Sequence, residues 1–300
     1  MHCLGYNDSM PELPEVETVR RGLYARIIGK QISRVWHDTE KNFPNSEADV
    51  RQFVVGASVL DVRRRAKVLM IDLDSNYTLV VHLKMTGQIV YRSEKDQFGA
   101  GHPNDSLVGE LPDRSTRVAI HFFDKSVLYF NDQRKFGWML LLPSVQLTDI
   151  DFFKAVGPEP LAADFTKTNF RQRLQRRLNS NIKATLLDQG VIAGIGNIYA
   201  DESLWGAKIH PNTLVKNIGD KQLNTLFTEL QYVLTLAIEK GGSTDKNYVN
   251  AEGKRGSYLS FARVFRREGK TCPRCGTTIE KIRVAGRGTH ICPQCQKVVE

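Results

Sequence analysis

The chain has no run of 18 apolar residues, so the sequence contains no candidate membrane-spanning helix. Residues 1–6 also lack the basic start and the apolar stretch that characterise a secretory signal. No internal repeat and no low-complexity segment is visible. These absences exclude an integral membrane protein and a repeat protein, and we expect a cytoplasmic protein.

Cysteine is scarce, with five residues among 300. Four of them form two CxxC pairs near the C-terminal end, and Cys3 is left over; the paired residues are Cys272, Cys275, Cys292 and Cys295. In a reducing compartment this spacing predicts a metal site and not disulfides. Two such pairs on a β-hairpin with arms at 277–284 and 286–291 would supply the four thiolates that zinc prefers. Because protein ligands would fill all four positions, we expect one structural Zn²⁺ ion without a chemical role.

The chain is basic, with 42 Lys and Arg residues against 33 Asp and Glu and a net charge of +9. A surplus of this size favours a polyanionic partner, although ordinary solubility charge is the alternative. Between the two cysteine pairs the sequence carries Lys281, Arg283, Arg287 and His290. These side chains would suit a phosphate clamp, and a solvated basic face is the alternative. No amphipathic helix with a basic polar face supports a membrane-surface role.

The first half of the chain is predicted to be mostly β-structure. Residues 14–28 have apolar positions at helical spacing, and five later segments are typical of strands: 59–62, 67–73, 78–83, 117–122 and 126–130. The last two are expected to form a hairpin around Asp124 and Lys125. Residues 93–115, with several glycines, are expected to form a loop.

The second half begins at a boundary marked by residues 157–160, Gly-Pro-Glu-Pro. An apolar stripe from Leu223 to Ala237 predicts a helix that ends at Gly241 and Gly242. Residues 243–268 are polar and basic and are expected to form a loop. The fold class is therefore α+β, with an N-terminal β-sandwich, its leading helix, a C-terminal helical domain and a β-hairpin zinc finger.

The segment Met10-Pro11-Glu12-Leu13-Pro14-Glu15-Val16-Glu17 is an unusual start for a helix. A helix N-terminus explains Pro14 in the first turn and the acidic residues after it. It does not explain Pro11 and Glu12, which therefore need another reason.

This segment resembles the start of the bacterial formamidopyrimidine-DNA glycosylases. Further matching motifs follow in order at residues 64–67, 82–87, 132–137, 157–161, 182–189, 194–200 and 286–296. The resemblance implies a base-excision repair enzyme that flips oxidised purines, namely 8-oxoguanine and formamidopyrimidines, out of double-stranded DNA. It implies removal of the base through a Schiff base and strand cleavage by β,δ-elimination, so both oxidised and abasic sites are expected partners of a monomeric enzyme.

The resemblance also implies a division of the chain. Residues 10–145 would be a catalytic β-sandwich domain, 157–242 a helix–two-turn–helix DNA-binding domain, 243–268 a lesion-capping loop and 270–300 the zinc finger. DNA would lie in a basic cleft between the two main domains. Residues 1–9 would be an extension that the mature chain lacks.

Four residues receive catalytic roles from the resemblance. Pro11, as a free N-terminal secondary amine, would attack C1′ of the damaged nucleoside. Glu12 would move protons at the sugar oxygen as general acid and base. Lys67 would donate a proton in β-elimination, and Arg287 would serve δ-elimination. Because an arginine is a poor proton donor, we favour a phosphate contact for Arg287.

Three side chains would fill the space left by the extruded base: Met85, Arg134 and Phe136. Phe136 would insert at a base step while Arg134 pairs with the orphaned base. From the sequence pattern alone, Met85 and Phe136 would be interpreted as core residues. The resemblance reverses that interpretation.

The remaining predicted DNA contacts are His82, Arg177, Lys183 and Asn197. Asn197 follows Gly194 and Gly196 in a turn whose amides could hold phosphate. Arg177 closes a basic run that begins at Arg171, for which a solvated helix face is the alternative. In the capping loop, Tyr258 and Phe261 are candidates for reading the lesion.

Two departures from the family pattern stand out. With residues 1–9 attached, the Pro11 nitrogen is a tertiary amide and cannot act as a nucleophile. We therefore expect translation to start at Met10, followed by removal of that methionine. Residues 114–117, Arg-Ser-Thr-Arg, replace a histidine-containing stretch, so Arg117 or His102 would substitute for a histidine contact, or the contact is lost.

Two other functions stay open from the sequence. One is the sister group of the superfamily that prefers oxidised pyrimidines, although the full Pro-Glu-Leu-Pro-Glu segment favours the purine branch. The other is a non-catalytic zinc protein that binds damaged DNA and keeps residues 1–9.

Overall fold

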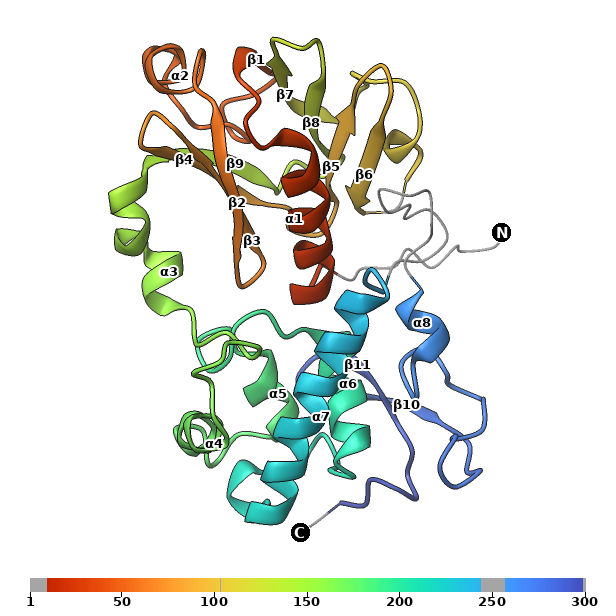
Figure 1. The fold of residues 1–300 in the computed structure, drawn as a ribbon. Coiled ribbons are helices and arrows are strands. Elements are labelled where there is room, and N and C mark those ends of the chain that lie inside the picture. Colours follow the sequence, from red (N-terminus) through yellow and green to blue (C-terminus); the bar gives the residue numbers. More distant parts are fainter. Residues whose placement is uncertain (1–9, 103, 244–256, 299–300) are drawn as a thin grey trace. The chain divides into compact units, whose positions relative to one another are not determined.

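The computed structural model describes residues 10–102, 104–243 and 257–298 (Figure 1). These residues form two compact units, the first within residues 10–150 and the second comprising 151–243 and 257–298. The predicted extension 1–9 lies outside the described residues, as do residues 244–256 of the predicted capping loop. No helix of the described ranges combines the length and apolar character needed to cross a membrane.

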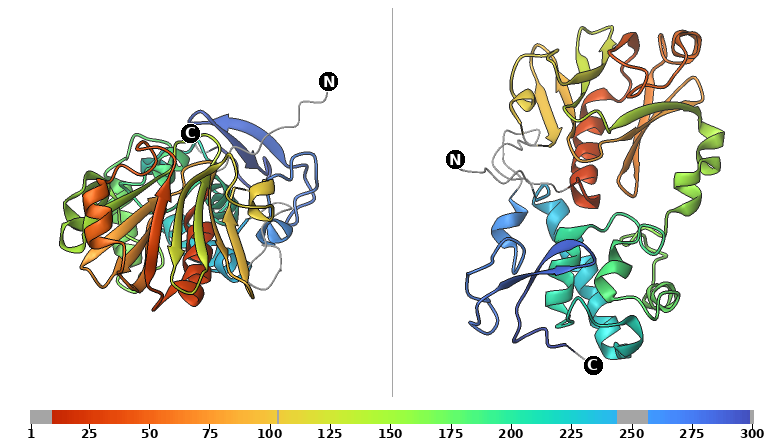
Figure 2. Two further views of the ribbon diagram at one scale, coloured as in Figure 1. Left: turned by 90° about the horizontal axis from the view of Figure 1, so that it is seen from above. Right: turned by 180° about the vertical axis from the view of Figure 1, so that it is seen from behind.

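The first unit contains two antiparallel sheets (Figures 1 and 2). The five-stranded sheet has the order β1 (Ile32–His37), β7 (Thr116–Phe122), β8 (Val127–Asp132), β5 (Gly87–Arg92) and β6 (Gln97–Gly101). The four-stranded sheet has the order β2 (Val59–Arg65), β3 (Val68–Leu73), β4 (Tyr77–His82) and β9 (Trp138–Pro143). The helices are α1 (Leu13–Ile27), α2 (Glu47–Phe53) and the 3₁₀ turns η1 (Asp105–Leu107) and η2 (Ser144–Asp149).

The core of this unit joins the leading helix to both sheets. Val16, Val19 and Leu23 lie on one face of α1 and pack with alternate residues of the strands, such as Val81 and Phe130. The predicted leading helix and β-sandwich are therefore confirmed. The predicted hairpin is also present, with Lys125 at φ 68° in the turn between β7 and β8.

The prediction of a loop over residues 93–115 is wrong for β6. Phe98 and Ala100 are buried in alternation and β6 pairs with β5 at the edge of the sheet. The glycines that suggested a loop are needed for packing: a Cβ at Gly99 would lie 2.9 Å from the Leu107 carbonyl oxygen. Gly101 has φ +123°, which an L side chain rarely adopts.

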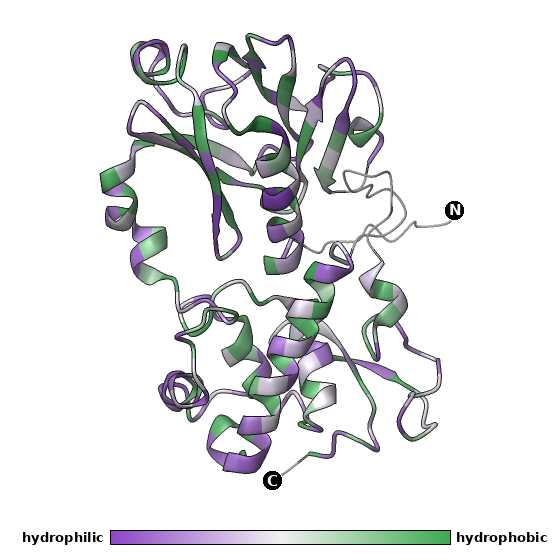
Figure 3. Ribbon diagram, viewed as in Figure 1, coloured by the Kyte–Doolittle hydropathy of each residue, from purple (hydrophilic) through white to green (hydrophobic). Residues whose placement is uncertain are grey.

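The second unit is helical with a terminal hairpin. Its elements are α3 (Asp151–Ala155), α4 (Lys167–Gln175), α5 (Ile182–Leu187), α6 (Asn197–Gly206), η3 (Val215–Asn217), α7 (Asp220–Glu239), α8 (Tyr258–Phe261), β10 (Glu280–Val284) and β11 (Arg287–Ile291). Hydrophobic and hydrophilic residues alternate along α7 (Figure 3), whose buried residues form the predicted stripe. After α7, the Gly242 N–H donates to the Ala237 carbonyl at 2.7 Å, as expected for a glycine that ends a helix.

Candidate functional site

Pro11 and Glu12 lie directly before the first turn of α1, and both are buried. Glu12 is the N-cap residue, with 3 % of its surface exposed. Its N–H donates to Glu15 Oε2 at 2.9 Å as part of a capping box. Glu15 therefore has a helix-capping contact that also fixes the backbone next to Pro11.

Lys67 lies in the turn between β2 and β3 and is buried. Ala66 before it has φ 53°, and its carbonyl accepts a hydrogen bond from Arg64 Nη1 at 3.0 Å. Arg64 Nε in turn lies 3.2 Å from Glu17 Oε2 on α1. Burial alone would raise the pKa of Glu17, but hydrogen bonds from Arg20 and other arginines lower it. An ionised Glu17 therefore links α1, which directly follows Pro11 and Glu12, to the turn that contains Lys67.

His82 ends β4 opposite Val68, and this register places it near Lys67. Burial and the charges of Lys84 and Lys67 lower the pKa of His82 to about 3. Its Nδ1 accepts a hydrogen bond from the Lys84 N–H at 3.0 Å. His82 is therefore neutral at physiological pH, and its predicted DNA contact would be a hydrogen bond and not an ion pair.

The structure brings together Met85, Arg134 and Phe136, which are predicted to fill the space of the extruded base and are called the wedge side chains from here on. Arg134 Nη1 lies 3.9 Å from Met85 Sδ, and the guanidinium carbon lies 5.1 Å from the centre of the Phe136 ring. Phe136 is 51 % exposed, which is not the burial of a core residue. The Lys41 ammonium group lies 5.5 Å from the same ring and adds a second cation beside it.

In the second unit, Asn197 begins α6 and contacts the hairpin that carries Arg287. Its Nδ2 donates to the Gly288 carbonyl at 3.0 Å. The Arg287 side chain is exposed at the start of β11, after a turn with two positive φ values at Ala285 and Gly286. Asn197 and Arg287 therefore belong to one cluster, which the sequence could not indicate because 90 residues separate them.

Lys183 occupies a different environment from the one that its predicted phosphate contact implies. Its side chain is 0 % exposed, and Nζ lies 2.6 Å from Asp201 Oδ1 and 2.6 Å from Thr289 Oγ1. Asp201 Oδ2 accepts the His290 N–H at 2.9 Å. Lys183 and Asp201 therefore connect α5 and α6 to the β10–β11 hairpin of the zinc finger. The phosphate contact of Lys183 stays a prediction.

Other predicted contacts also have structural partners. Arg177 is exposed and pairs with Asp188 at 2.8 Å. Tyr258 is buried and its ring packs against Tyr199, whereas Phe261 is 47 % exposed.

The proposed substitute Arg117 is buried as well. Its guanidinium group donates to the Asp132 carbonyl at 2.9 Å, to Asp38 and to the Arg114 carbonyl. A direct DNA contact by Arg117 would break these three bonds. His102 is half-buried and its carbonyl accepts from Gln88.

The four paired cysteines converge on one point. Their sulfur atoms all lie within 4.8 Å of one another, with Cys275 3.4 Å from Cys292 and 3.5 Å from Cys295. Sulfur atoms at about 2.3 Å from a tetrahedral zinc ion lie about 3.8 Å apart, and the observed spacing is compatible with that arrangement. Hydrogen bonds from Thr277 lower the pKa of Cys275 to about 6, which favours its thiolate form. The site fits one structural Zn²⁺ ion.

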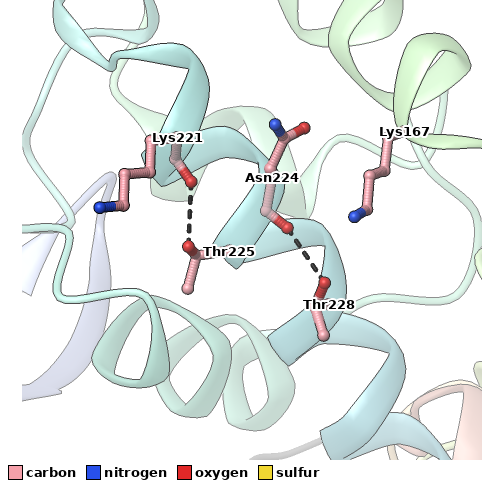
Figure 4. A pocket seen from close by; sticks show the side chains of 5 residues that line it. All are labelled: Lys167, Lys221, Asn224, Thr225 and Thr228. Atoms are coloured by element: carbon pink, nitrogen blue, oxygen red, sulfur yellow. Dashed lines mark hydrogen bonds between the residues drawn. The ribbon is translucent and has the colours of Figure 1, made fainter.

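A surface groove of about 480 Å³ lies between α4 and α7, and it is lined by Lys167, Lys221, Asn224, Thr225 and Thr228 (Figure 4). The two threonine hydroxyls donate to main-chain carbonyls of their own helix. None of the predicted site residues lines this groove.

The matches to known families cover most of the chain. The formamidopyrimidine-DNA glycosylase N-terminal domain matches residues 10–139, and the H2TH domain of the same enzymes matches residues 156–248. A zinc finger found in FPG and IleRS matches residues 269–298.

Full-length relatives show the same similarity. The chain is 40 % identical to a formamidopyrimidine-DNA glycosylase of Pediococcus pentosaceus, over 96 % of this chain and 99 % of the relative. It is 42 % identical to one of Chloroflexus aurantiacus, over 96 % and 98 %. A Lactococcus lactis FPG mutant in complex with DNA containing Fapy-dG has a TM-score of 0.84 at 33 % identity, covering 96 % of this chain and all of that chain. MutM of Thermus thermophilus has a TM-score of 0.81 at 35 % identity, covering 97 % and 100 %. The chain therefore belongs to the formamidopyrimidine-DNA glycosylase family of DNA repair glycosylases and AP lyases.

Proposed function

We propose that this chain removes formamidopyrimidines and 8-oxoguanine from double-stranded DNA and then cleaves the strand, with Pro11 as the nucleophile. The observation that carries the proposal is the full-length family match together with Pro11 and Glu12 at the start of α1. The Lactococcus lactis Fpg was solved with DNA that contains an abasic site, and a mutant of it with DNA that contains Fapy-dG, which supports these lesions as substrates. We expect the enzyme to act as a monomer on DNA in the bacterial cytoplasm.

The proposed chemistry begins at the Pro11 nitrogen. Its lone pair attacks C1′, and the damaged base leaves with the electrons of the glycosidic bond and takes up a proton. Glu12 supplies and removes protons at the sugar ring oxygen, so that an iminium ion forms. Loss of the C2′ proton then breaks the C3′–O bond and expels the 3′ phosphate, and a second elimination breaks the C5′–O bond and expels the 5′ phosphate. Water hydrolyses the remaining iminium ion, which releases the sugar fragment as an aldehyde and restores the Pro11 amine. The product is a one-nucleotide gap with phosphates at both ends.

The neighbouring residues have supporting roles in this proposal. Lys67 donates a proton in β-elimination, and Arg287 and Asn197 hold phosphates near the lesion. Met85, Arg134 and Phe136 fill the space that the extruded base leaves. Residues 243–268 cap the base, and the zinc finger within residues 270–300 presents Arg287.

The proposal requires Pro11 to be the first residue of the active enzyme, because an internal proline nitrogen is an amide. The test compares two forms of the protein, one beginning at Pro11 and one retaining residues 1–9. Each is incubated with an 8-oxoguanine duplex and sodium borohydride, and covalent complexes are measured by intact mass. Only the form beginning at Pro11 should be trapped, while both should bind zinc and DNA.

Replacement of Glu12 by Gln in the shorter form should lower the rate of base excision by about 10²–10⁴-fold. Equal trapping of both forms, with the adduct mapped to a lysine, would show that Pro11 is not the nucleophile. A duplex with an oxidised pyrimidine is tested in parallel. Faster cleavage of this duplex than of the 8-oxoguanine duplex would indicate the activity of the sister group.

A further inference from the structure

Asp132, at the end of β8, collects hydrogen bonds from two separate loops. Its carboxylate oxygen Oδ1 accepts the Thr86 hydroxyl and the Arg134 N–H, the latter at 3.1 Å. The other oxygen, Oδ2, accepts the N–H groups of Phe136 at 2.8 Å and Gly137 at 2.7 Å. The Asp132 residue is 1 % exposed, so these four donors replace the water that its carboxylate would otherwise bind.

The Asp132 backbone is fixed as well. Its N–H donates to the Ser115 carbonyl at 2.7 Å, and its own carbonyl accepts from the buried Arg117 side chain at 2.9 Å. Gly87, which follows Thr86, pairs with Asp132 across the β5–β8 ladder. The carboxylate therefore lies at a rigid point where the β4–β5 and β8–β9 connections meet.

The two connections carry the wedge side chains. Met85 directly precedes Thr86, and Arg134 and Phe136 lie in the turn that the Asp132 carboxylate closes. Lys135 in this turn has φ 56°. A Cβ at Gly137 would lie 2.7 Å from the Phe130 ring, so the turn can approach the sheet this closely only with glycine there.

We propose that Asp132, together with Thr86, is a positioning residue that holds Met85, Arg134 and Phe136 in the arrangement needed to enter DNA. The inference rests on the proposed function, in which these side chains replace an extruded base. The three side chains are linked to the sheet by bonds to a buried carboxylate, so their loops are ordered before DNA arrives. Ordering in advance lowers the entropy lost on binding, and this gain matters most when a stacked base must be displaced.

The test uses Thr86→Val, which keeps the shape of the side chain and removes its hydrogen bond, with Thr86→Ser as the matched control. Single-turnover rates are measured on an 8-oxoguanine duplex and on a duplex with a preformed abasic site. The valine variant should lose about tenfold in base excision, the size of one buried hydrogen bond. Its cleavage at the abasic site should fall less than about threefold, since no base has to leave the stack. The serine variant should behave as wild type.

A second measurement reports directly on the entry of the wedge side chains into DNA. With 2-aminopurine beside the lesion, fluorescence should rise on binding of wild-type protein and rise less with Thr86→Val. Asp132→Asn should have a larger effect, because one oxygen is replaced by a donor that faces N–H groups. Thermal unfolding shows whether each variant folds. If Asp132→Asn does not fold, the Thr86→Val variant decides the test.

Two results would overturn the inference: equal losses on both substrates, which a general destabilisation produces, or no loss on either. Failure of the proposed function has a different signature, namely a wild-type protein that cleaves neither duplex. The 2-aminopurine signal still separates wild type from Thr86→Val in that case, and an unchanged signal overturns the positioning role.

Discussion

Replacement of Lys183 by Met should destabilise the second unit strongly. The Lys183 ammonium group and the Asp201 carboxylate are 2.6 Å apart and both side chains are 0 % exposed. Without the lysine, Asp201 keeps the His290 N–H at 2.9 Å but loses its ionic partner, and Thr289 loses a hydrogen bond. Breaking one side of a buried ion pair costs about 3–5 kcal/mol because a buried charge is left uncompensated. We expect a loss of this size in the free energy of unfolding.

The assay combines urea unfolding with DNA binding at several salt concentrations. A phosphate contact contributes about 0.9 to the slope of log affinity against log salt. If Lys183 holds the hairpin in place and does not touch DNA, Lys183→Met lowers stability and leaves this slope unchanged. The double variant Lys183→Met with Asp201→Asn is the control, because it also removes the buried charge and should recover part of the lost stability.

The opposite pattern would refute the reasoning. A Lys183→Met protein with wild-type unfolding and a slope smaller by about 0.9 would show that the lysine leaves Asp201 and binds a phosphate. The phosphate contact predicted from the sequence would then be right.

Two further predictions concern pH and zinc. The folded pKa of His82 is about 3, below the value of about 6.5 expected when unfolded, so the unfolded chain takes up the proton first as pH falls. Between pH 6 and 4, wild type should lose about 1.4 kcal/mol per pH unit more than His82→Gln in urea unfolding, and parallel curves would contradict this. Substitution of the buried Cys292 by Ser should remove zinc and DNA affinity but leave the unfolding transition of the first unit in place. Loss of that transition in circular dichroism would contradict the independence of the two units.

The apolar patterns of the sequence predicted β2, β3, β4, β7 and β8, but they did not predict β1, β5, β6 and β9. Residues 68–71 of β3 are continuously buried, and such runs are visible without a structure. β1 was not predicted, because as an edge strand it exposes Arg34 and Trp36 and buries little. β6 was not predicted because its glycines are usual in loops. The packing of Leu107 against Gly99 and the positive φ of Gly101 explain them, and neither is visible in the sequence.

The candidate site, too, could be predicted from the sequence only in part. The zinc ligands follow from local spacing, and the structure gathers all four sulfur atoms. The grouping of Met85 with Phe136 does not follow from spacing, since both residue types are common in cores and 51 residues separate them. Asp132, which connects their loops, could have been suspected from its place before a turn, where aspartate accepts backbone N–H groups.

The position of Arg287 depends on more than the zinc ion. Residues 198–206 of α6 are all buried, so this helix is enclosed on every side. At its start Asn197 holds the Gly288 carbonyl, and at its end Arg274 donates to the Trp205 carbonyl at 2.9 Å. The Arg274 guanidinium carbon also lies 3.8 Å from the centre of the Trp205 indole, a cation–π contact worth about 0.5–2 kcal/mol. Both ends of α6 therefore contact the zinc finger. A substitution at Asn197 or at Arg274 should change the position of Arg287, even when the four cysteines and the metal are intact.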